Sequence, residues 1–153
     1  MNGCMYCEMN ESVDRLMIPI AELRVSRLFL LMDQSFKGRC VLELRDHYTE
    51  VDEIPKAQGI AFYEDLSDSV AAIRKVFHPD KVNYAIIGDL VPHFHVHLVP
   101  KYQNGPMWGK PYCAEPVAAE QLIEEEYRTQ VENIREALKM SDLEKHNGKR
   151  TDK

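Results

Sequence analysis

Short apolar segments bounded by turn residues predict a β-sheet in this chain. Gly38 marks a turn between the first two segments, which favours a hairpin with a longer loop. The last two segments are sequential and close, so we expect them to pair antiparallel. The segments are residues 18–32, which fit one or two strands, and residues 39–44, 81–87 and 93–101.

Apolar residues at spacings near three and four predict two long helices. The first covers about residues 57–77 and should end near His78, because Pro79 disfavours helical geometry in the residue before it. The second covers residues 117–140, after a loop rich in Pro and Gly at residues 104–116. The apolar positions of the first helix are Ile60, Phe62, Tyr63, Leu66, Val70, Ile73 and Phe77.

These elements predict one α+β domain, with an antiparallel sheet of about five strands and two main helices. A chain of 153 residues with 44% apolar residues can bury a core of its own. We expect residues 1–143 to form the domain. Residues 144–153 are charged and lack apolar anchors, so a flexible tail is expected there.

The net charge of −6 argues against a nucleic-acid-binding surface, since phosphate backbones are bound by basic patches. The chain opens without a basic-then-apolar signal sequence, and its apolar runs fall short of the roughly 20 residues that span a bilayer. We therefore expect a cytoplasmic protein that binds no membrane, and we expect its cysteines to be reduced thiols or metal ligands. Cys40 and Cys113 have no partner at a recognisable spacing.

Three alternating histidines are the most informative feature of the chain. Side chains on a strand alternate between faces, so His93, His95 and His97 share one face. The intervening residues, Phe94, Val96 and Leu98, point into the core. Clusters of ionisable residues of this kind mark functional sites.

The segment at residues 93–99 resembles the histidine triad (HIT) signature, in which three histidines alternate with apolar residues. The flanks, residues 80–89 and 100–102 with Trp108 and Pro111, look like a zinc-bearing bacterial branch similar to diadenosine tetraphosphate hydrolases. The resemblance implies the HIT fold. It also implies a nucleotide hydrolase or nucleotidyl transferase that acts on dinucleoside polyphosphates or nucleoside phosphoramidates.

In this family the middle histidine is the nucleophile, and His95 stands at the matching position. A neutral imidazole can attack phosphorus and form a covalent nucleotidyl intermediate. The third histidine, His97, would stabilise developing charge as an imidazolium or as an N–H donor.

Two other functions fit the same histidines. One is a metal-dependent enzyme with a His-x-His pair. However, residues two apart on a strand are separated by roughly 6.6 Å and residues four apart by roughly 13 Å, so three alternating histidines exceed one mononuclear site. The other is a nucleotide-binding module without turnover.

Cys4 and Cys7 have the two-residue gap that lets two thiolates bind one zinc ion. A redox pair or two idle thiols fit the same spacing, although a thioredoxin-like pair belongs after a strand. Zinc-bearing triad proteins complete the pair with a later histidine and the first triad histidine. The resemblance therefore implies one structural zinc held by Cys4, Cys7, His47 and His93.

The resemblance also implies substrate contacts, at Asp33 for the ribose hydroxyls and at Asn83 and Asp89 before the triad. Asp33 fits a plain turn residue as well. The chain departs from the family at three positions: Phe36 stands where Pro is usual, Arg39 where His is usual and Asp89 where Asn is common. An acid at Asp89 would repel a phosphate.

Triad proteins similar to this chain pair as symmetric dimers that join two five-stranded sheets, with the helix before the last two strands at the interface. The broad apolar surface of residues 57–77 fits such an interface. Twofold dimers are also the commonest soluble oligomers. We expect a homodimer.

Overall fold

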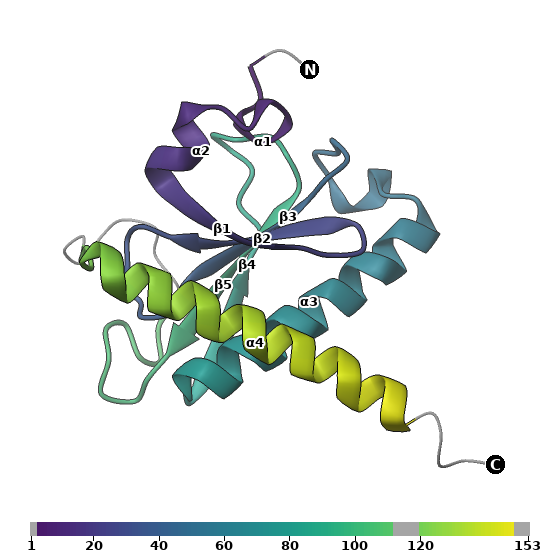
Figure 1. Ribbon diagram of the computed structural model, residues 1–153. Helices are drawn as coiled ribbons and strands as arrows, with labels where there is room; N and C mark the ends of the chain where they lie inside the picture. The colour runs from purple at the N-terminus through teal and green to yellow at the C-terminus, as the bar shows by residue number, and fades with distance from the viewer. Residues whose placement is uncertain (1–2, 112–119, 149–153) are drawn as a thin grey trace.

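The computed structural model describes residues 3–111 and 120–148, with the backbone alone described for residues 141–148. It contains one five-stranded antiparallel sheet in the order β1-β2-β3-β5-β4 (Figure 1). The predicted fold class is confirmed. The strands are β1 (Met17–Glu22), β2 (Ser26–Leu31), β3 (Cys40–Leu44), β4 (Lys81–Ala85) and β5 (His95–Lys101).

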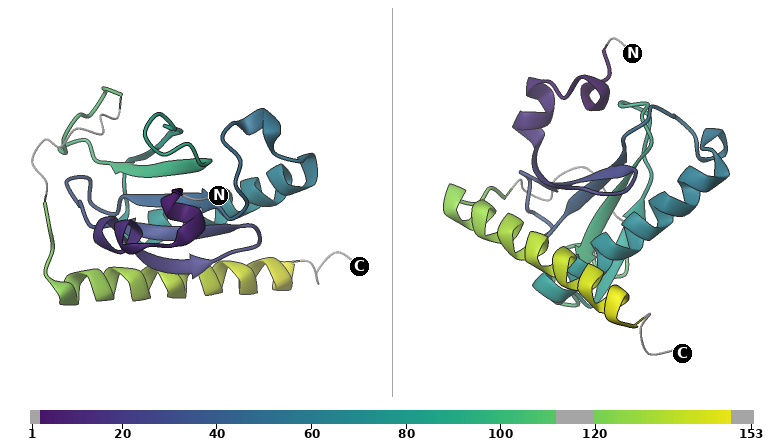
Figure 2. Two further views of the ribbon diagram at one scale, coloured as in Figure 1. Left: turned by 90° about the horizontal axis from the view of Figure 1, so that it is seen from above. Right: turned by 45° about the vertical axis from the view of Figure 1, so that its right-hand side comes forward.

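Helices cover the two faces of the sheet unequally. The long helices α3 (Lys56–Phe77) and α4 (Glu124–Gly148) lie on one face, and the short helices α1 (Met5–Glu8) and α2 (Glu11–Leu16) lie over part of the other (Figures 1 and 2). A 3₁₀ turn, Val51–Glu53, precedes α3. Within the described residues no helix is both long and apolar enough to cross a bilayer.

The main core lies between the sheet and the long helices, and a smaller core lies under α1 and α2. Alternation along the strands separates the two sets because successive side chains point to opposite faces. The main core includes Leu28, Leu30, Leu42, Leu44, Val96, Leu98, Phe62, Ile73 and Ile134. The smaller core consists of Tyr6, Val13, Met17, Phe29 and Val41.

The ends of three predicted elements were wrong, and the simplest case is the segment at residues 81–87, whose strand ends at Ala85. β5 begins at His95 and not at His93, because His93 lies in a turn after Pro92, with its N–H bonded to the Val91 carbonyl. The second helix begins at Glu124 and not near residue 117. Three glutamates occupy its first turn, where negative side chains stabilise a helix by interacting with the positive end of its dipole. The helix continues to Gly148, and residues 149–153 of the predicted tail lie outside the described residues.

Asp65 anchors α3 to the turn between β1 and β2. Its carboxylate is fully buried and accepts the backbone N–H groups of Arg24 and Val25 at 3.2 and 3.0 Å. It also accepts the Ser26 hydroxyl at 2.7 Å and the Arg24 guanidinium at 3.0 Å. One side chain therefore satisfies the donors of a whole turn.

Asp65→Ala should lower the free energy of unfolding by about 3 kcal/mol, because it leaves buried donors without an acceptor. Urea denaturation measures the change. Glu64→Ala is the matched control: Glu64 also contacts Arg24, at 3.3 Å, but is exposed, so its loss should cost less than about 1 kcal/mol. Equal effects of the two substitutions would contradict the anchoring role.

Candidate functional site

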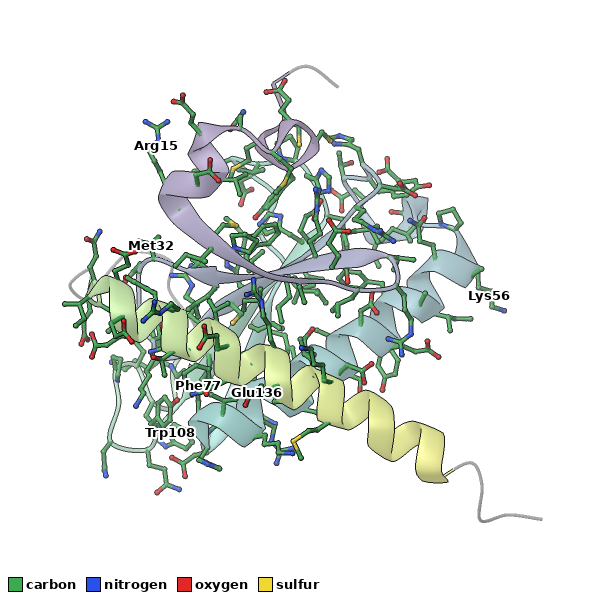
Figure 3. The ribbon with its side chains drawn as sticks, viewed as in Figure 1. Arg15, Met32, Lys56, Phe77, Trp108 and Glu136 are labelled. Atoms are coloured by element: carbon green, nitrogen blue, oxygen red, sulfur yellow. The ribbon has the colours of Figure 1, made fainter. Side chains whose placement is uncertain are left out.

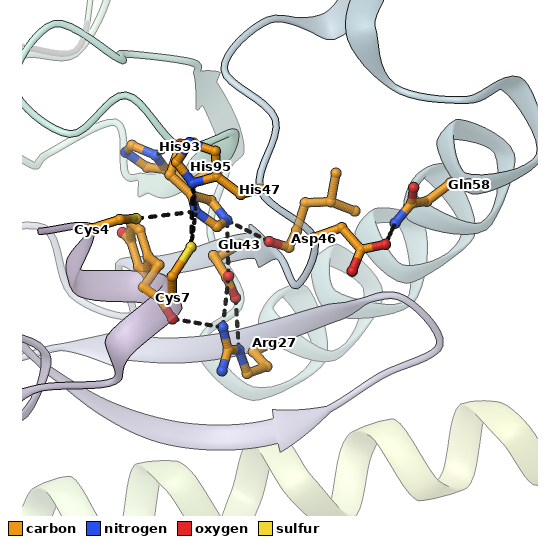
Figure 4. A network of polar contacts seen from close by, with 11 residues as sticks. Cys4, Cys7, Arg27, Glu43, Asp46, His47, Gln58, His93 and His95 are labelled. Atoms are coloured by element: carbon orange, nitrogen blue, oxygen red, sulfur yellow. Dashed lines mark hydrogen bonds and ion pairs between the residues drawn. The ribbon is translucent and has the colours of Figure 1, made fainter. Parts of the chain in front are cut away.

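Four side chains from three parts of the chain converge at one end of β5 (Figure 4). The ligand atoms of Cys4, Cys7, His47 and His93 all lie within 4.8 Å of one another. The Sγ atoms of Cys4 and Cys7 lie 3.3 and 3.6 Å from Nδ1 of His93. Nδ1 of His47 lies 3.3 Å from Cys7 Sγ and 3.2 Å from Nδ1 of His93. Ligands of a tetrahedral zinc ion, at about 2.0–2.3 Å from the metal, lie roughly 3.3–3.8 Å apart, and these four contacts are close to that spacing.

The second nitrogen of His93 is fixed by groups behind the cluster. Nε2 lies 2.6 Å from the Leu44 carbonyl and 3.0 Å from the Glu43 carboxylate, so it carries the proton. Nδ1 is therefore left with its lone pair directed at the cysteines. Glu43 is fully buried and paired twice with Arg27, at 2.8 Å each (Figure 4). Arg27 in turn donates to the Tyr6 carbonyl of α1 at 2.9 Å, which ties the helix that contains Cys7 and directly follows Cys4 to the sheet.

His47 lies in the segment between β3 and the 3₁₀ turn. Its neighbour Asp46 accepts a hydrogen bond from Gln58 of α3 at 2.8 Å, which holds this segment against the helix (Figure 4). The structure thus brings together all four residues that the sequence predicted as metal ligands.

His95 is oriented by the backbone beside it. Its Nδ1 lies 2.6 Å from the His93 carbonyl, an acceptor only, so Nδ1 must donate. In the neutral ring Nε2 is then unprotonated and has a free lone pair. Burial lowers the pKa of His95, which favours the neutral ring. The Tyr6 ring packs beside the His95 ring, and the centroids of the two rings lie 5.3 Å apart.

His97 is linked to Asp33 through Arg39. The Arg39 guanidinium, which is buried, lies 3.5 Å from Nδ1 of His97 and 3.6 Å from the Asp33 carboxylate. Arg is a donor only, so Nδ1 of His97 accepts and Nε2 carries the proton. Burial, the Arg39 charge and His95 lower the pKa of His97 to about 3. Of the two forms expected for His97, this environment favours the neutral N–H donor over the imidazolium.

Arg39→Gln should raise the pKa of His97, because it removes the neighbouring positive charge while burial remains. NMR titration of the imidazole C–H signals measures the shift, with exposed Arg45→Gln as the control. An unchanged His97 pKa in Arg39→Gln would contradict the assigned contact.

The lowered pKa of His97 also makes the free energy of unfolding depend on pH. Between about pH 6.5 and pH 3 the unfolded chain binds a proton at His97 that the folded chain does not. The contribution of His97 to the free energy of unfolding therefore falls as the pH falls through this window.

The three predicted substrate residues occupy different places. Asp33 contacts Arg39, which in turn contacts His97, and Asp33 also accepts the Ser35 N–H at 3.0 Å. It is therefore a turn residue and is also linked to His97 through Arg39. Asp89 lines a cleft of about 260 Å³ next to His95. Asn83 lies on β4, cross-strand from Val99, and lines a separate cavity of about 490 Å³.

Comparison with known protein families gives a match over residues 20–104 to the model of the HIT domain. The chain belongs to the HIT domain family. No curated protein is significantly similar to this HIT domain in sequence.

Solved histidine triad structures share its fold. A histidine triad protein from Sinorhizobium meliloti is 26% identical, with a TM-score of 0.76 over 84% of this chain and 94% of that chain. One from Marinobacter aquaeolei is 22% identical, with a TM-score of 0.77 over 86% and 96% of the two chains. A zinc-bound family protein from Mycobacterium smegmatis is 22% identical, with a TM-score of 0.64 over 92% and 96%.

Sequence reasoning missed the residues that support the histidines, above all Glu43 and Arg27. A signal was present: Glu43 is a lone acid in the apolar run of β3. In the sheet it pairs with Arg27 on one side and His95 on the other. That register could not be read from local pattern alone. Cys40 is buried in β3, and Cys113 lies outside the described residues.

Proposed function

We propose that this HIT domain hydrolyses or transfers nucleotides, with His95 as the nucleophile. The supporting observation is the hydrogen bond from His95 Nδ1 to the His93 carbonyl, which leaves Nε2 free to attack. The proposed substrates are dinucleoside polyphosphates and nucleoside phosphoramidates, the classes that the resemblance to HIT proteins implies.

The proposed reaction has two steps. The Nε2 lone pair of His95 forms a bond to the α-phosphorus, and the bond to the leaving oxygen or nitrogen breaks with its electron pair. Water then attacks the phosphorus of the nucleotidyl-histidine, which releases the nucleoside monophosphate and restores the imidazole. His97, held as an N–H donor by Arg39, would hydrogen-bond to the phosphoryl or leaving-group oxygen as charge develops. Asp33 would accept the ribose hydroxyls from its place beside Arg39.

Asp89 would lie close to the leaving group, because its cleft adjoins His95. Incubation of the protein with diadenosine tetraphosphate and with adenosine phosphoramidates tests the function. The expected result is release of nucleoside monophosphate. Binding of both compounds without turnover would instead identify a nucleotide-binding module.

We also propose that the Cys4, Cys7, His47 and His93 cluster holds one structural zinc ion. Its donor set, its tetrahedral spacing and the Glu43 partner of His93 support this assignment. The zinc-bound relative from Mycobacterium smegmatis lends further support. A closed set of four protein ligands leaves no open position, so the ion would hold α1 to the catalytic strand and take no part in the reaction.

We also propose that the protein is a homodimer. β4 is an edge strand of the sheet, and large apolar side chains are exposed on α3, on β4 and in the segment after β4. They are Ile60, Tyr63, Tyr84, Ile86, Ile87 and Leu90.

Light scattering at micromolar concentration should give a mass of twice 17.7 kDa. Tyr63→Glu places a charge on the exposed face of α3 and should shift the protein toward the monomer. A wild-type mass near 17.7 kDa would rule out the dimer.

A further inference from the structure

Three lysines surround one cavity on the sheet, away from the histidines. The cavity, which we call the lysine pocket, has a volume of about 490 Å³ and is lined by Lys81, Lys101, Lys110, Asn83 and Trp108. Trp108 lies in the segment after β5, at the opposite end of the molecule from α1 (Figure 3). The cavity thus lies far from the cysteine cluster.

The lysine pocket lies on the same face of the sheet as His95 and His97. Cross-strand partners share a face, and the register pairs Ala85 with His97 and Lys81 with Lys101. Lys101 follows His97 by four positions on β5, so it is about 13 Å further along the same face. The pocket therefore continues the surface on which the histidines lie.

Lys101 is the unusual member of the set, because it is a buried cation. Only 3% of its surface is exposed. Its ammonium donates to the Met107 carbonyl at 2.6 Å and lies 5.2 Å from the centre of the Phe36 ring. Both partners are uncharged, whereas lysines are seldom buried this deeply unless they are paired with an acid.

Charge around the lysine pocket is unbalanced within the described residues. The lining there includes no carboxylate, and no ion pair between described residues involves Lys81, Lys101 or Lys110. Asp80, next to Lys81, accepts the Gln103 N–H at 2.9 Å and is not part of the lining. Three lysines thus line one cavity of a chain whose net charge is −6.

We propose that the lysine pocket is a second anion-binding site, which takes the phosphoryl groups of a polyphosphate. An anion there would supply the charge partner that the buried Lys101 lacks and would also attract the ammonium groups of Lys81 and Lys110. The Asn83 amide is a further donor, and the half-exposed Trp108 ring offers a face against which a ligand could stack.

Titration calorimetry with inorganic triphosphate tests the site without any turnover, so its outcome is separable from that of the proposed function. Wild-type protein should bind triphosphate, and more weakly as salt is added. Lys81→Gln and Lys110→Gln are exposed changes that should each weaken binding several-fold, and Lys101→Met should weaken it about tenfold. Lys56→Gln, on the far end of α3, should change it less than twofold (Figure 3).

The site is overturned if wild-type protein does not bind triphosphate, or if Lys81→Gln and Lys110→Gln bind it as wild type does. The site is also overturned if Lys56→Gln weakens binding as much as Lys81→Gln and Lys110→Gln do, since triphosphate would then be attracted by the charge of the whole protein and not by the pocket. These two exposed variants keep the test valid even if Lys101→Met fails to fold.

Substrate kinetics then distinguish two sources of the anion. If the pocket holds the distal phosphates of a substrate, Lys81→Gln should raise KM for diadenosine tetraphosphate and leave KM for a neutral-amine phosphoramidate unchanged. If the occupant is a separate polyphosphate, both KM values should stay the same while triphosphate binding falls. Either result is consistent with the anion site.

Discussion

His95→Ala should abolish turnover, with a fall in kcat of about 10⁴-fold or more, because it removes the atom that forms the covalent bond to phosphorus. His97→Ala should slow turnover less, since it removes one hydrogen bond to the developing charge while Arg39 remains nearby. Nucleoside monophosphate release, measured by chromatography, gives both rates.

His78→Ala is the matched control for these substitutions. His78 is exposed at the end of α3 and should leave the rate unchanged. Circular dichroism should show the same secondary structure in all three variants. Turnover by His95→Ala close to the wild-type rate would contradict the proposed mechanism.

Cys7→Ser should lower the melting temperature by roughly 5–10 °C and reduce the zinc content well below one ion per chain. Metal binding to the folded protein contributes to its stability, so loss of a ligand lowers that stability. Chemistry should be less affected than stability, because the cysteines do not contact His95 Nε2 in the proposed mechanism. Thermal denaturation and elemental analysis measure the two quantities.

Glu11→Gln, an exposed change in the same N-terminal segment, should leave both zinc content and melting temperature as in wild type. Wild-type protein purified without chelators but free of zinc would refute the metal site. Removal of zinc from wild-type protein should reproduce the melting temperature of Cys7→Ser.

Periodic features of the sequence predicted the elements of this fold well. Short apolar segments identified the regions of the strands, with residues 18–32 left as one or two strands, and Pro79 correctly placed the end of α3, where His78 adopts a left-handed conformation. The short helices α1 and α2 were not predicted. With four and six residues they are too short to show a hydrophobic period, and they are held by tertiary contacts such as Tyr6 against Phe29.

The candidate site was predictable where its residues lie close in sequence or match a known motif. The alternation of His93, His95 and His97 and the spacing of Cys4 and Cys7 are of this kind. The start of β5 at His95 was not, because it depends on hydrogen bonds between Phe94 and the distant Tyr48 and Leu44.

The same limit applies to Arg39. As a charged residue at the start of a strand it could equally have pointed to solvent. Only the pairing of β3 with β5 places it beside His97 and makes it part of the site. Long-range register therefore accounts for most of what the sequence did not reveal.

The proposed mechanism requires a nucleotide adduct on His95. Rapid quenching of the protein with diadenosine tetraphosphate, followed by peptide mass spectrometry, tests it directly. We expect an adenylyl group on the peptide that contains residues 93–99, attached to His95 in the wild type and absent in His95→Ala. Turnover in which this peptide stays unmodified, or carries the group on His97, would contradict it.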